Sequence, residues 1–507
     1  MTTDRPADAP AAETPRPRAH FTARDTWFND PNGLLYHDGV YHLFFQSNPH
    51  GSIWGNMSWG HATSTDLVHW AEQPVAIPCT EDELVFSGSA VVDHHNTAGF
   101  AGAGETALVA IYTSVAMDDS GLQTQSLAFS VDAGATWTRY GGNPVLDIGS
   151  ADFRDPKVFW HGGEDGHWVM LVVEATEHVV AIYTSPDLKT WARASDFGPA
   201  HATGGVWECP DLFPLRVAAT GETRWALIVS LNPGGIAGGS GTQYFVGDFD
   251  GERFTAEYLT DSTDPADYDW LDFGRDYYAA VSFANVPDGR RLMIGWASNW
   301  DYANDTPTAP WRSAMSLVRE IGLERTRDGR HKIRQVPVLP HDAVRLTLGA
   351  SAGAATGHDD GHDDGAAALA FDASAPLAAG SVTTFVLDAG ADGGADGDAD
   401  LDGDADGAGR ADGAGDGASG EELRLVVDAD AGTLTCDRTR AAAEAFHPTF
   451  ASVDSAPIPD AAVAAGTLEL QIVVDACVVE VYAAGGLATF TELVFPSRPF
   501  TRLRRLA

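Results

Sequence analysis

Short apolar segments recur along the first two thirds of the chain, and Gly, Asp or Asn turn residues bound them. The segments are YHLFF at 41–45, LVAIY at 108–112, WVMLVV at 168–173, WALIV at 225–229 and LMIGW at 292–296. Their short length and their β-branched and aromatic residues predict strands rather than helices. Five such strands at similar intervals predict five similar β units.

A second phrase repeats with the same rhythm. Ser-x-Asp followed by an aromatic residue occurs in TSTDLVHW (63–70), FSVDAGATW (129–137) and TSPDLKTW (184–191), and GDFDGERF (247–254) resembles a weaker fourth copy. Intervals of about 55 to 65 residues are too long for most helical solenoids. They are typical of the four-stranded blades of a β-propeller.

A short segment with an acidic residue precedes each apolar run by roughly 10 to 17 residues. If each unit is one blade, this segment is its innermost strand, and five inner strands surround one axis. Acids from distant parts of the chain can then converge, and clustered like charges often mark a functional site. These acids are Asp30, Asp93, Asp155, Glu208 with Asp211, and Asp276. We interpret Asp93 as structural and expect Asp276 to contact either substrate or only Arg154.

Glu208 stands between Trp207 and Cys209 in the otherwise apolar segment GVWECPDLFPL. Removing a carboxylate from water is costly unless something compensates for it. One interpretation is structural, a salt bridge or a solvated loop, and for an isolated Glu it would be favoured. The other is a carboxyl group that holds a proton near neutral pH for catalysis. The repeated acids favour the second interpretation.

From about residue 345 onward the chain is rich in Ala, Gly and Asp, with scattered strand segments. Alternation in LELQIVVD (468–475) and VVEVYA (478–483) predicts antiparallel strands and a β-sandwich. Residues 388–422 contain almost no apolar side chain, which predicts a disordered insert. Within it, DGDADG (402–407) resembles the start of an EF-hand calcium loop, but Gly413 stands where a bidentate Glu is needed. We therefore favour a solvated insert over a metal site.

The net charge is −41, because 72 Asp and Glu face only 31 Lys and Arg. A surface this acidic repels nucleic acid and anionic membranes and is compatible with a neutral substrate. This composition is typical of proteins from a high-salt habitat or from a GC-rich genome, and we favour the explanation by a GC-rich genome. No apolar run reaches the length of a membrane span.

The first twenty residues are polar and rich in Pro and Ala, without the apolar core of a secretory signal. The four cysteines match no zinc-binding pattern; they are Cys79, Cys209, Cys436 and Cys477. These features predict a cytoplasmic protein with reduced thiols, or a secreted one if the N-terminus is incomplete.

Six segments carry a resemblance to a known family: WFNDPNG (27–33), FSGSAVV (86–92), FRDPKVF (153–159), ECPDL (208–212), DFGRDYYAAVSF (272–283) and IGWASNWDYANDTPTAPWRSAMSLVREIGL (294–323). Together they resemble glycoside hydrolase family 32, the β-fructosidases, which include levanases, exo-inulinases and invertases. The resemblance implies an all-β fold, with a five-bladed β-propeller followed by a C-terminal β-sandwich. We expect a disordered tail at 1–18, a catalytic propeller at 19–338 and a sandwich at 345–507.

The resemblance also implies residue roles. Asp30 matches the nucleophile, Glu208 the general acid/base and Asp155 the transition-state stabiliser. The residues expected to line the fructosyl subsite are Asn29, Gln46, Trp54, Phe86, Ser87, Arg154 and Trp296. No metal or cofactor is expected.

The chemistry explains why these residue types are needed. A retaining glycosidase needs one ionised carboxylate for attack and one protonated carboxyl group for the leaving oxygen. We expect Asn29 and Asn32 to donate hydrogen bonds to Asp30. Trp207 and the neighbouring carboxylates would favour protonated Glu208, and Arg154 would keep Asp155 ionised.

The implied activity is release of terminal β-fructosyl units from levan, inulin-type oligosaccharides or sucrose through a covalent fructosyl-enzyme. Residues 294–323 favour the exo-inulinase, levanase and yeast-type invertase branch. A levan fructotransferase or a biose-releasing exo-levanase on the same scaffold is the alternative. A sugar-binding propeller without activity would lack one of the three carboxylates, and a sialidase would need an arginine cluster. Linkage preference, oligomeric state and the role of the insert stay open.

Overall fold

The computed structural model describes residues 15–348, 353–356, 368–390 and 420–506. Strands form nearly all of the regular structure in these ranges, where the helices are η1 (Pro265–Asp267) and α1 (Asp460–Ala465). The all-β prediction is confirmed. None of the described helices is long and apolar enough to cross a membrane. Most of the predicted tail and insert, including 402–407, lies outside the described residues.

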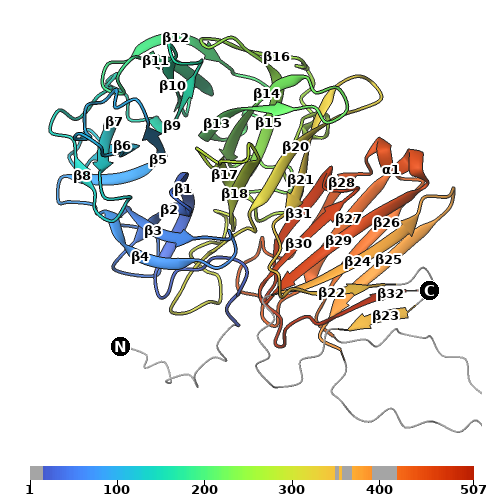
Figure 1. Cartoon of the computed structure of the whole chain (residues 1–507). Helices are drawn as coiled ribbons and strands as arrows, with labels where there is room; N and C mark the ends of the chain where they lie inside the picture. Colours follow the sequence, from blue (N-terminus) through green and yellow to red (C-terminus); the bar gives the residue numbers. More distant parts are fainter. Residues whose placement is uncertain (1–14, 349–352, 357–367, 391–419, 507) are drawn as a thin grey trace, which may run out of the picture.

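The strands up to Pro337 form five antiparallel sheets that follow one another along the chain (Figure 1). The first sheet contains β1 (Trp27–His37), β2 (Val40–Asn48), β3 (Ser58–Ser64) and β4 (Ala71–Ile77). The second contains β5 (Glu83–Asp93), β6 (Ala107–Ala116), β7 (Gln123–Ser130) and β8 (Thr138–Arg139). The third contains β9 (Phe153–His161), β10 (His167–Glu174), β11 (Val179–Ser185) and β12 (Ala192–Phe197).

The fourth and fifth sheets continue this pattern. The fourth contains β13 (Val206–Arg216), β14 (Thr223–Asn232), β15 (Gly241–Phe249) and β16 (Phe254–Ala256). The fifth contains β17 (Tyr278–Ser282), β18 (Arg291–Ala297), β20 (Arg319–Arg325) and β21 (His331–Pro337), with β19 (Ala314–Met315) paired to β18. Short turns join the strands: between β1 and β2, Asp38 and Gly39 both have positive φ, as tight hairpin turns require.

Apolar side chains fill the space between each pair of neighbouring sheets. Leu35 and Phe44 of the first sheet, for example, pack with Tyr112 of the second. Comparable clusters lie between the second and third, the third and fourth, and the fourth and fifth sheets, and the fifth shares a cluster with the first. The first strands contact one another in the order β1, β5, β9, β13 and β17, and β17 contacts β1. Because the second strands are covered on both faces, their sequences are continuously apolar rather than alternating.

The remaining strands form two sheets around a second core. One contains β22 (Val344–Thr347), β24 (Leu369–Pro376), β29 (Thr467–Asp475), β30 (Val478–Ala483) and β31 (Ala488–Leu493). The other contains β23 (Gly353–Thr356), β32 (Arg502–Arg505), β25 (Val382–Asp388), β26 (Glu422–Asp428), β27 (Thr433–Arg440) and β28 (Val453–Pro457). Alternate side chains of both sheets form a single hydrophobic cluster, which includes Phe371, Phe385 and Ile472.

The ends of the predicted insert pair with each other. Asp388, the last residue of β25, is the register partner of Glu422, the first residue of β26. Arg502 and Arg504 donate to Asp388, each at 2.7 Å, and Arg440 donates to Glu422 at 2.8 Å. The insert therefore connects two neighbouring strands of one sheet.

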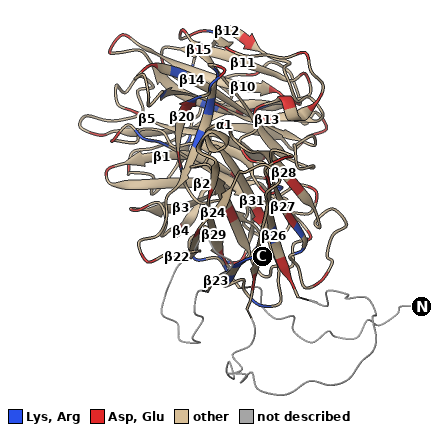
Figure 2. Ribbon diagram, turned by 90° about the vertical axis from the view of Figure 1, so that its right-hand side faces the viewer, with Lys and Arg blue, Asp and Glu red and all other residues tan. Residues whose placement is uncertain are grey.

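Buried charges join the two parts of the chain. Arg319 of β20 donates to Asp272 at 2.9 Å and to Glu480 of β30 at 3.2 Å. A cavity of about 760 Å³ also lies between the β20–β21 hairpin and the segment around α1. Figure 2 shows Lys and Arg gathered near β20 and α1, and Arg325, Arg330 and Lys332 line this cavity.

Candidate active site

Each of the five first strands has an irregularity in its pairing at the same relative place. The register shifts between Phe28 and Pro31, between Val85 and Gly88, between Arg154 and Lys157, between Glu208 and Asp211, and between Tyr278 and Val281. A bulge of this kind bends the strand and turns its side chains in a new direction. The predicted residues Asn29, Asp30, Phe86, Ser87, Arg154, Asp155 and Glu208 all lie within or beside these bulges.

Three bulge residues have left-handed backbone conformations although none is glycine. Asp155 has φ +65°, Cys209 has φ +48° and Ala279 has φ +52°. This conformation costs a non-glycine residue roughly 1 to 2 kcal/mol. Strain of this kind tends to occur at functional sites, where the surrounding packing maintains it.

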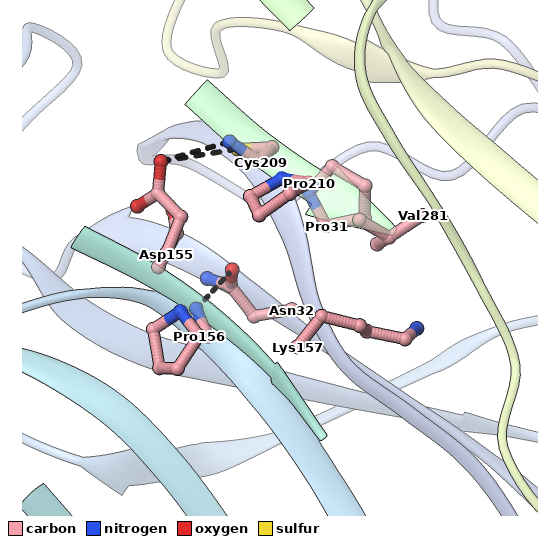
Figure 3. Close-up of a pocket in the computed structure, with 10 residues that line it drawn as sticks. Pro31, Asn32, Asp155, Pro156, Lys157, Cys209, Pro210 and Val281 are labelled. Carbon is pink, nitrogen blue, oxygen red and sulfur yellow. Dashed lines mark hydrogen bonds between the residues drawn. The ribbon is translucent and has the colours of Figure 1, made fainter. Parts of the chain in front are cut away.

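A narrow pocket lies where the five first strands meet, and Figure 3 shows the side chains that line it. Every first strand contributes to the lining, which consists of Pro31, Asn32, Ser87, Gly88, Asp155, Pro156, Lys157, Cys209, Pro210 and Val281. Segments that lie far apart in the sequence therefore surround one pocket. Asp155 lines it, and Asp30 lies beside it, because the lining residues Ser87 and Cys209 both contact Asp30.

Asp30 is held by two side-chain donors. Ser87 Oγ donates to Asp30 Oδ2 at 2.7 Å, and Asn29 Nδ2 donates to Asp30 Oδ1 at 3.0 Å. Burial and the nearby charge of Glu208 raise the pKa of Asp30 to about 6, against the lowering effect of these hydrogen bonds. Asn29 thus donates to Asp30 as predicted. Asn32 does not: its Nδ2 is buried without an acceptor among the described residues, and its Oδ1 accepts from the Gly88 amide at 3.3 Å.

Asp155 accepts a hydrogen bond from the backbone amide of Cys209 at 2.9 Å. Its own amide donates to Thr113 Oγ1 at 2.9 Å, which anchors the strained bulge. Burial and the charge of Glu208 raise the pKa of Asp155 to about 7, and Arg154 opposes that rise. Arg154 therefore favours the ionised form of Asp155, in the predicted direction, without outweighing burial.

Glu208 is held on both sides. Arg154 Nε donates to its Oε1 at 3.2 Å, and the Tyr278 hydroxyl donates to its Oε2. Trp207 does not take part, because neighbouring side chains on a strand point to opposite faces. Its indole lies in the core between the third and fourth sheets and donates to the Ala202 carbonyl at 2.8 Å. The expected contribution of Trp207 to the protonation of Glu208 was wrong, and Arg154 and Tyr278 form the environment instead.

Two further residues of the site had no role assigned from the sequence. The Cys209 thiol lies 3.7 Å from Asp30 Oδ2 and 3.7 Å from Asp155 Oδ2, so the two carboxyl groups flank one sulfur atom. Tyr278 stands directly before the bulge of β17, in the position that Glu208 occupies in β13. The repeat spacing could have identified Tyr278, because it aligns the two strands.

Aromatic side chains line the surroundings of the carboxyl groups. Trp296 lies 6.0 Å from Trp27 and 4.9 Å from Trp300, measured between ring centroids. Trp27 Nε1 donates to Asn29 Oδ1 at 2.9 Å, so this group of indoles is linked to the residue that holds Asp30. The indole N–H of Trp296 is buried and has no acceptor among the described residues.

The remaining subsite residues also lie near the bulges. Gln46 is buried in β2, between Phe45 and Ser47, the register partners of Pro31 and Phe28, and therefore lies opposite Asp30. Trp54 is 42% exposed and packs edge-on against Phe86 at 6.2 Å. An exposed indole beside a buried polar pocket is suited to contact a sugar ring.

Three other acids of the repeat lie outside this group. Asp93 accepts from the backbone amides of Thr97 at 2.9 Å and Ala98 at 2.8 Å, so the structural interpretation is confirmed. Asp211 pairs with Lys157 at 3.1 Å. Asp276 contacts neither the pocket residues nor Arg154: it pairs with Arg438 and Tyr302, and that expectation was wrong.

The described residues contain no group of three or more His, Cys, Asp or Glu side chains arranged to hold a metal ion. What they do contain is an all-β scaffold with three neighbouring carboxyl groups. Asp155 lines the pocket, Asp30 accepts from neutral donors, and Glu208 accepts from an arginine and a tyrosine. Paired carboxyl groups in unequal environments are the apparatus of glycoside hydrolysis. The fold and the site thus define the class of the protein as a glycosidase.

Comparison with known proteins identifies the family. The glycosyl hydrolases family 32 N-terminal domain matches residues 20–337, and the glycosyl hydrolases family 32 C-terminal domain matches residues 410–506. The chain belongs to glycosyl hydrolase family 32.

Its relatives cover nearly the whole chain. It is 40% identical over 497 residues to the levanase of Bacillus subtilis (strain 168), covering 95% of this chain and 67% of that protein. It is 38% identical to an extracellular exo-inulinase of Aspergillus niger, covering 96% of this chain and 91% of that protein. The crystal structure of exo-inulinase from Aspergillus awamori matches with a TM-score of 0.83 and 36% identity, covering 97% of this chain and 95% of that chain.

Proposed function

We propose that this protein releases terminal β-fructosyl units from fructans, from sucrose or from both, through a covalent fructosyl-enzyme. The observation that carries the proposal is the grouping of three carboxyl groups from three different sheets: Cys209 Sγ lies 3.7 Å from both Asp30 and Asp155, and the charge of Glu208 acts on both. The names of the relatives support the substrate class: levanase and exo-inulinase among the sequences, and a Schwanniomyces occidentalis fructofuranosidase complexed with fructose among the structures. That fructofuranosidase is 31% identical and matches with a TM-score of 0.80, covering 97% of this chain and 95% of that chain.

In the first step, Asp30 attacks the anomeric carbon of the fructosyl unit. The bond from that carbon to the leaving oxygen breaks as Glu208 transfers its proton to the oxygen, so an ester to Asp30 and a free alcohol result. In the second step, Glu208 takes a proton from water. The water oxygen attacks the anomeric carbon, fructose is released and Asp30 is free again.

The surroundings of the carboxyl groups suit these roles. Asp30 accepts from Ser87, Asn29 and the Cys209 thiol, and these neutral donors leave its negative charge available for attack. Asp155 is oriented by the Cys209 amide so that it can hold fructosyl hydroxyl groups. Such contacts lower the barrier when they strengthen as positive charge develops on the ring.

The substrate-binding residues follow from the same geometry. We assign the fructosyl subsite to Asn29, Gln46, Trp54, Phe86, Ser87, Arg154 and Trp296. The buried indole N–H of Trp296 and the buried amide of Gln46 have no acceptor among the described residues, and sugar hydroxyl groups would supply one.

We also infer the finer architecture. The five sheets with mutually contacting first strands are assigned as the blades of a five-bladed β-propeller, and the two later sheets as a β-sandwich. We propose the boundaries 19–338 and 345–507, and the change of sheet between β21, which ends at Pro337, and β22, which begins at Val344, supports a division near this point.

A product chromatogram tests the function. The protein is incubated separately with sucrose, inulin and levan, beside a Glu208→Gln variant and an Asp93→Asn variant as a matched change at a buried structural acid. We expect fructose as the first product in wild type and Asp93→Asn, and at least a hundredfold lower rate in Glu208→Gln.

Other outcomes have definite meanings. If the first product is a difructose, the enzyme is a biose-releasing one. If it is a cyclic dianhydride or a longer oligomer, the enzyme is a fructosyltransferase. No product from any of the three sugars would refute the proposed function.

A further inference from the structure

A second buried arginine joins the two parts of the chain and leads toward the active site. Arg438 belongs to β27 of the C-terminal part, and none of its side chain is exposed. Its Nη1 donates to Asp276 Oδ2, and its Nη2 donates to the Tyr302 hydroxyl at 2.7 Å. That hydroxyl donates in turn to Asp276 Oδ1, so the three side chains form a closed triangle.

The triangle holds one end of the segment 299–304. The backbone amide of Ala303 donates to the Asn299 carbonyl at 2.9 Å, which closes a tight turn. Asn304 Oδ1 accepts from the Trp54 amide at 3.0 Å. Trp300 packs on Trp296 at 4.9 Å and on Trp27 at 5.9 Å. The segment therefore supports aromatic residues on two sides of the assigned subsite.

The same triangle supports the acid/base residue through β17. Asp276 stands two residues before Tyr278, whose hydroxyl donates to Glu208. The Asp276 amide donates to the Thr491 carbonyl at 3.0 Å, and the Leu493 amide donates to Asp276 Oδ2 at 2.8 Å. The start of β17 is thus fixed against β31 of the C-terminal part.

We propose that Arg438 is a positioning residue for the fructosyl subsite, through which the C-terminal part orients Trp54, Trp300 and Tyr278. This inference rests on the proposed function. Arginine suits the role because its planar fork binds two acceptors at once, whereas lysine offers a single ammonium centre.

The expected effect is moderate, because other contacts also hold the segment. Asn299 Nδ2 donates to the Arg275 carbonyl at 2.7 Å, and Arg275 pairs with Asp301 at 2.6 Å. Loss of the Arg438 link should loosen the segment without releasing it. Substrate binding should then suffer more than turnover.

Two variants with matched controls test the proposal. Tyr302→Phe removes only the hydroxyl group of the triangle. Arg438→Lys keeps a positive charge beside Asp276 and beside Glu492, whose Oε2 lies 3.2 Å from Arg438 Nη1. The controls lie in the neighbouring interface network: Tyr482→Phe removes a hydroxyl group that donates to Glu480, and Arg319→Lys alters the arginine that Glu480 binds. All four are compared with wild type for sucrose hydrolysis, well below their unfolding temperatures.

We expect KM to rise roughly five- to twentyfold in Tyr302→Phe and Arg438→Lys, with a smaller change in kcat, and the inhibition constant for fructose to rise in parallel. Tyr482→Phe and Arg319→Lys should lower thermal stability but leave KM within about twofold of wild type. Equal KM values in all four folded variants would overturn the proposal, as would a loss of activity that only follows the unfolded fraction. Failure of the proposed function is distinct, because wild type itself would then release no fructose.

Discussion

At the scale of single residues, Asp155 shows how the site opposes the stability of the fold. Its side chain is buried beside two other carboxyl groups, and its pKa is raised to about 7 by burial and Glu208. In the unfolded chain an aspartate ionises near pH 4. Between these values the folded state retains a proton that the unfolded state has lost, so stability falls as pH rises. The proposed role of Asp155 requires the ionised form nonetheless, because only a charged carboxylate can stabilise positive charge in the transition state.

Replacing Asp155 by Asn should therefore stabilise the protein while it removes activity. Asn keeps an acceptor for the Cys209 amide but carries no charge. We expect the free energy of unfolding at pH 8 to exceed that of wild type by on the order of 2 kcal/mol, since a tenfold change in an ionisation constant corresponds to about 1.4 kcal/mol. The advantage should shrink as pH is lowered from 7 toward 4. Denaturant unfolding at pH 4, 6 and 8 measures it.

Asp93→Asn is the control for this experiment, because that carboxyl group is buried but satisfied by backbone amides. It should show no stabilisation at pH 8. Equal behaviour of the two variants would mean that the cost of ionisation is not specific to the active site.

At the scale of elements, the bulges of the first strands bring the side chains to the axis. A regular strand would place Asp155, Glu208 and Tyr278 by strict alternation. The bulge interrupts that alternation, and the left-handed residue at its centre makes the turn. Ala279 occupies this place in β17 with φ +52° and is fully buried.

Ala279 should accept Gly but reject a β-branched residue. Gly relieves about 1 to 2 kcal/mol of backbone strain, which offsets the lost methyl burial and the greater freedom of the unfolded chain. We expect Ala279→Gly to lie within about 1 kcal/mol of wild type and Ala279→Val to cost more than about 3 kcal/mol, through both strain and overpacking. Chemical denaturation measures both variants.

Ala280 supplies the comparison, because it is equally buried but lacks a positive φ. Ala280→Gly should therefore lower the free energy of unfolding more than Ala279→Gly does. The reverse order would show that the bulge is not strained.

At the scale of the whole molecule, the start of the described chain is fastened to the C-terminal part. The amides of Arg18, Ala19 and His20 all donate to the Asp475 carboxylate, at 2.8 to 3.1 Å. The buried His20 ring also contacts Asp475 at 2.8 Å and Glu480 at 3.3 Å. Burial alone would lower the pKa of His20, but these two carboxylates raise it to about 9.

The His20 contacts should make stability depend on pH in alkaline solution. Because the folded pKa of about 9 exceeds the unfolded value of 6.5, the contribution is complete below pH 6.5 and is lost as pH rises through 9. We expect the unfolding temperature of wild type to fall more steeply between pH 6.5 and 9.5 than that of His20→Gln. Calorimetry across this range measures the difference, and parallel curves would contradict it.

Much of the site could be predicted before the fold was known. The interval before each apolar run indicated six acids, and the resemblance to glycoside hydrolase family 32 singled out Asp30, Asp155 and Glu208 among them. In the structure these three carboxyl groups are neighbours. Asp276 shares that spacing but belongs to the interface with the C-terminal part. Spacing identifies the strand on which a residue lies, whereas the partner that it meets depends on which strands pack beside it. Cys209 was not predicted for the same reason, since its role consists of contacts with Asp30 and Asp155 from other sheets. Tyr278 could have been found by the repeat spacing, but its contact with Glu208 could not.

The sequence by itself determined the all-β class and the repeated units, because apolar periodicity is a local property, and its resemblance to glycoside hydrolase family 32 singled out the three carboxylates. Only the tertiary structure decided that Glu208 lies between Arg154 and Tyr278 rather than against Trp207, and that Arg438 reaches toward the site from the C-terminal part. These pairings join residues far apart in the chain, and they depend on strand bulges and domain packing. Burial, side-chain direction and hydrogen-bond partners are properties of the assembled fold, and they raise the pKa values of Asp30 and Asp155.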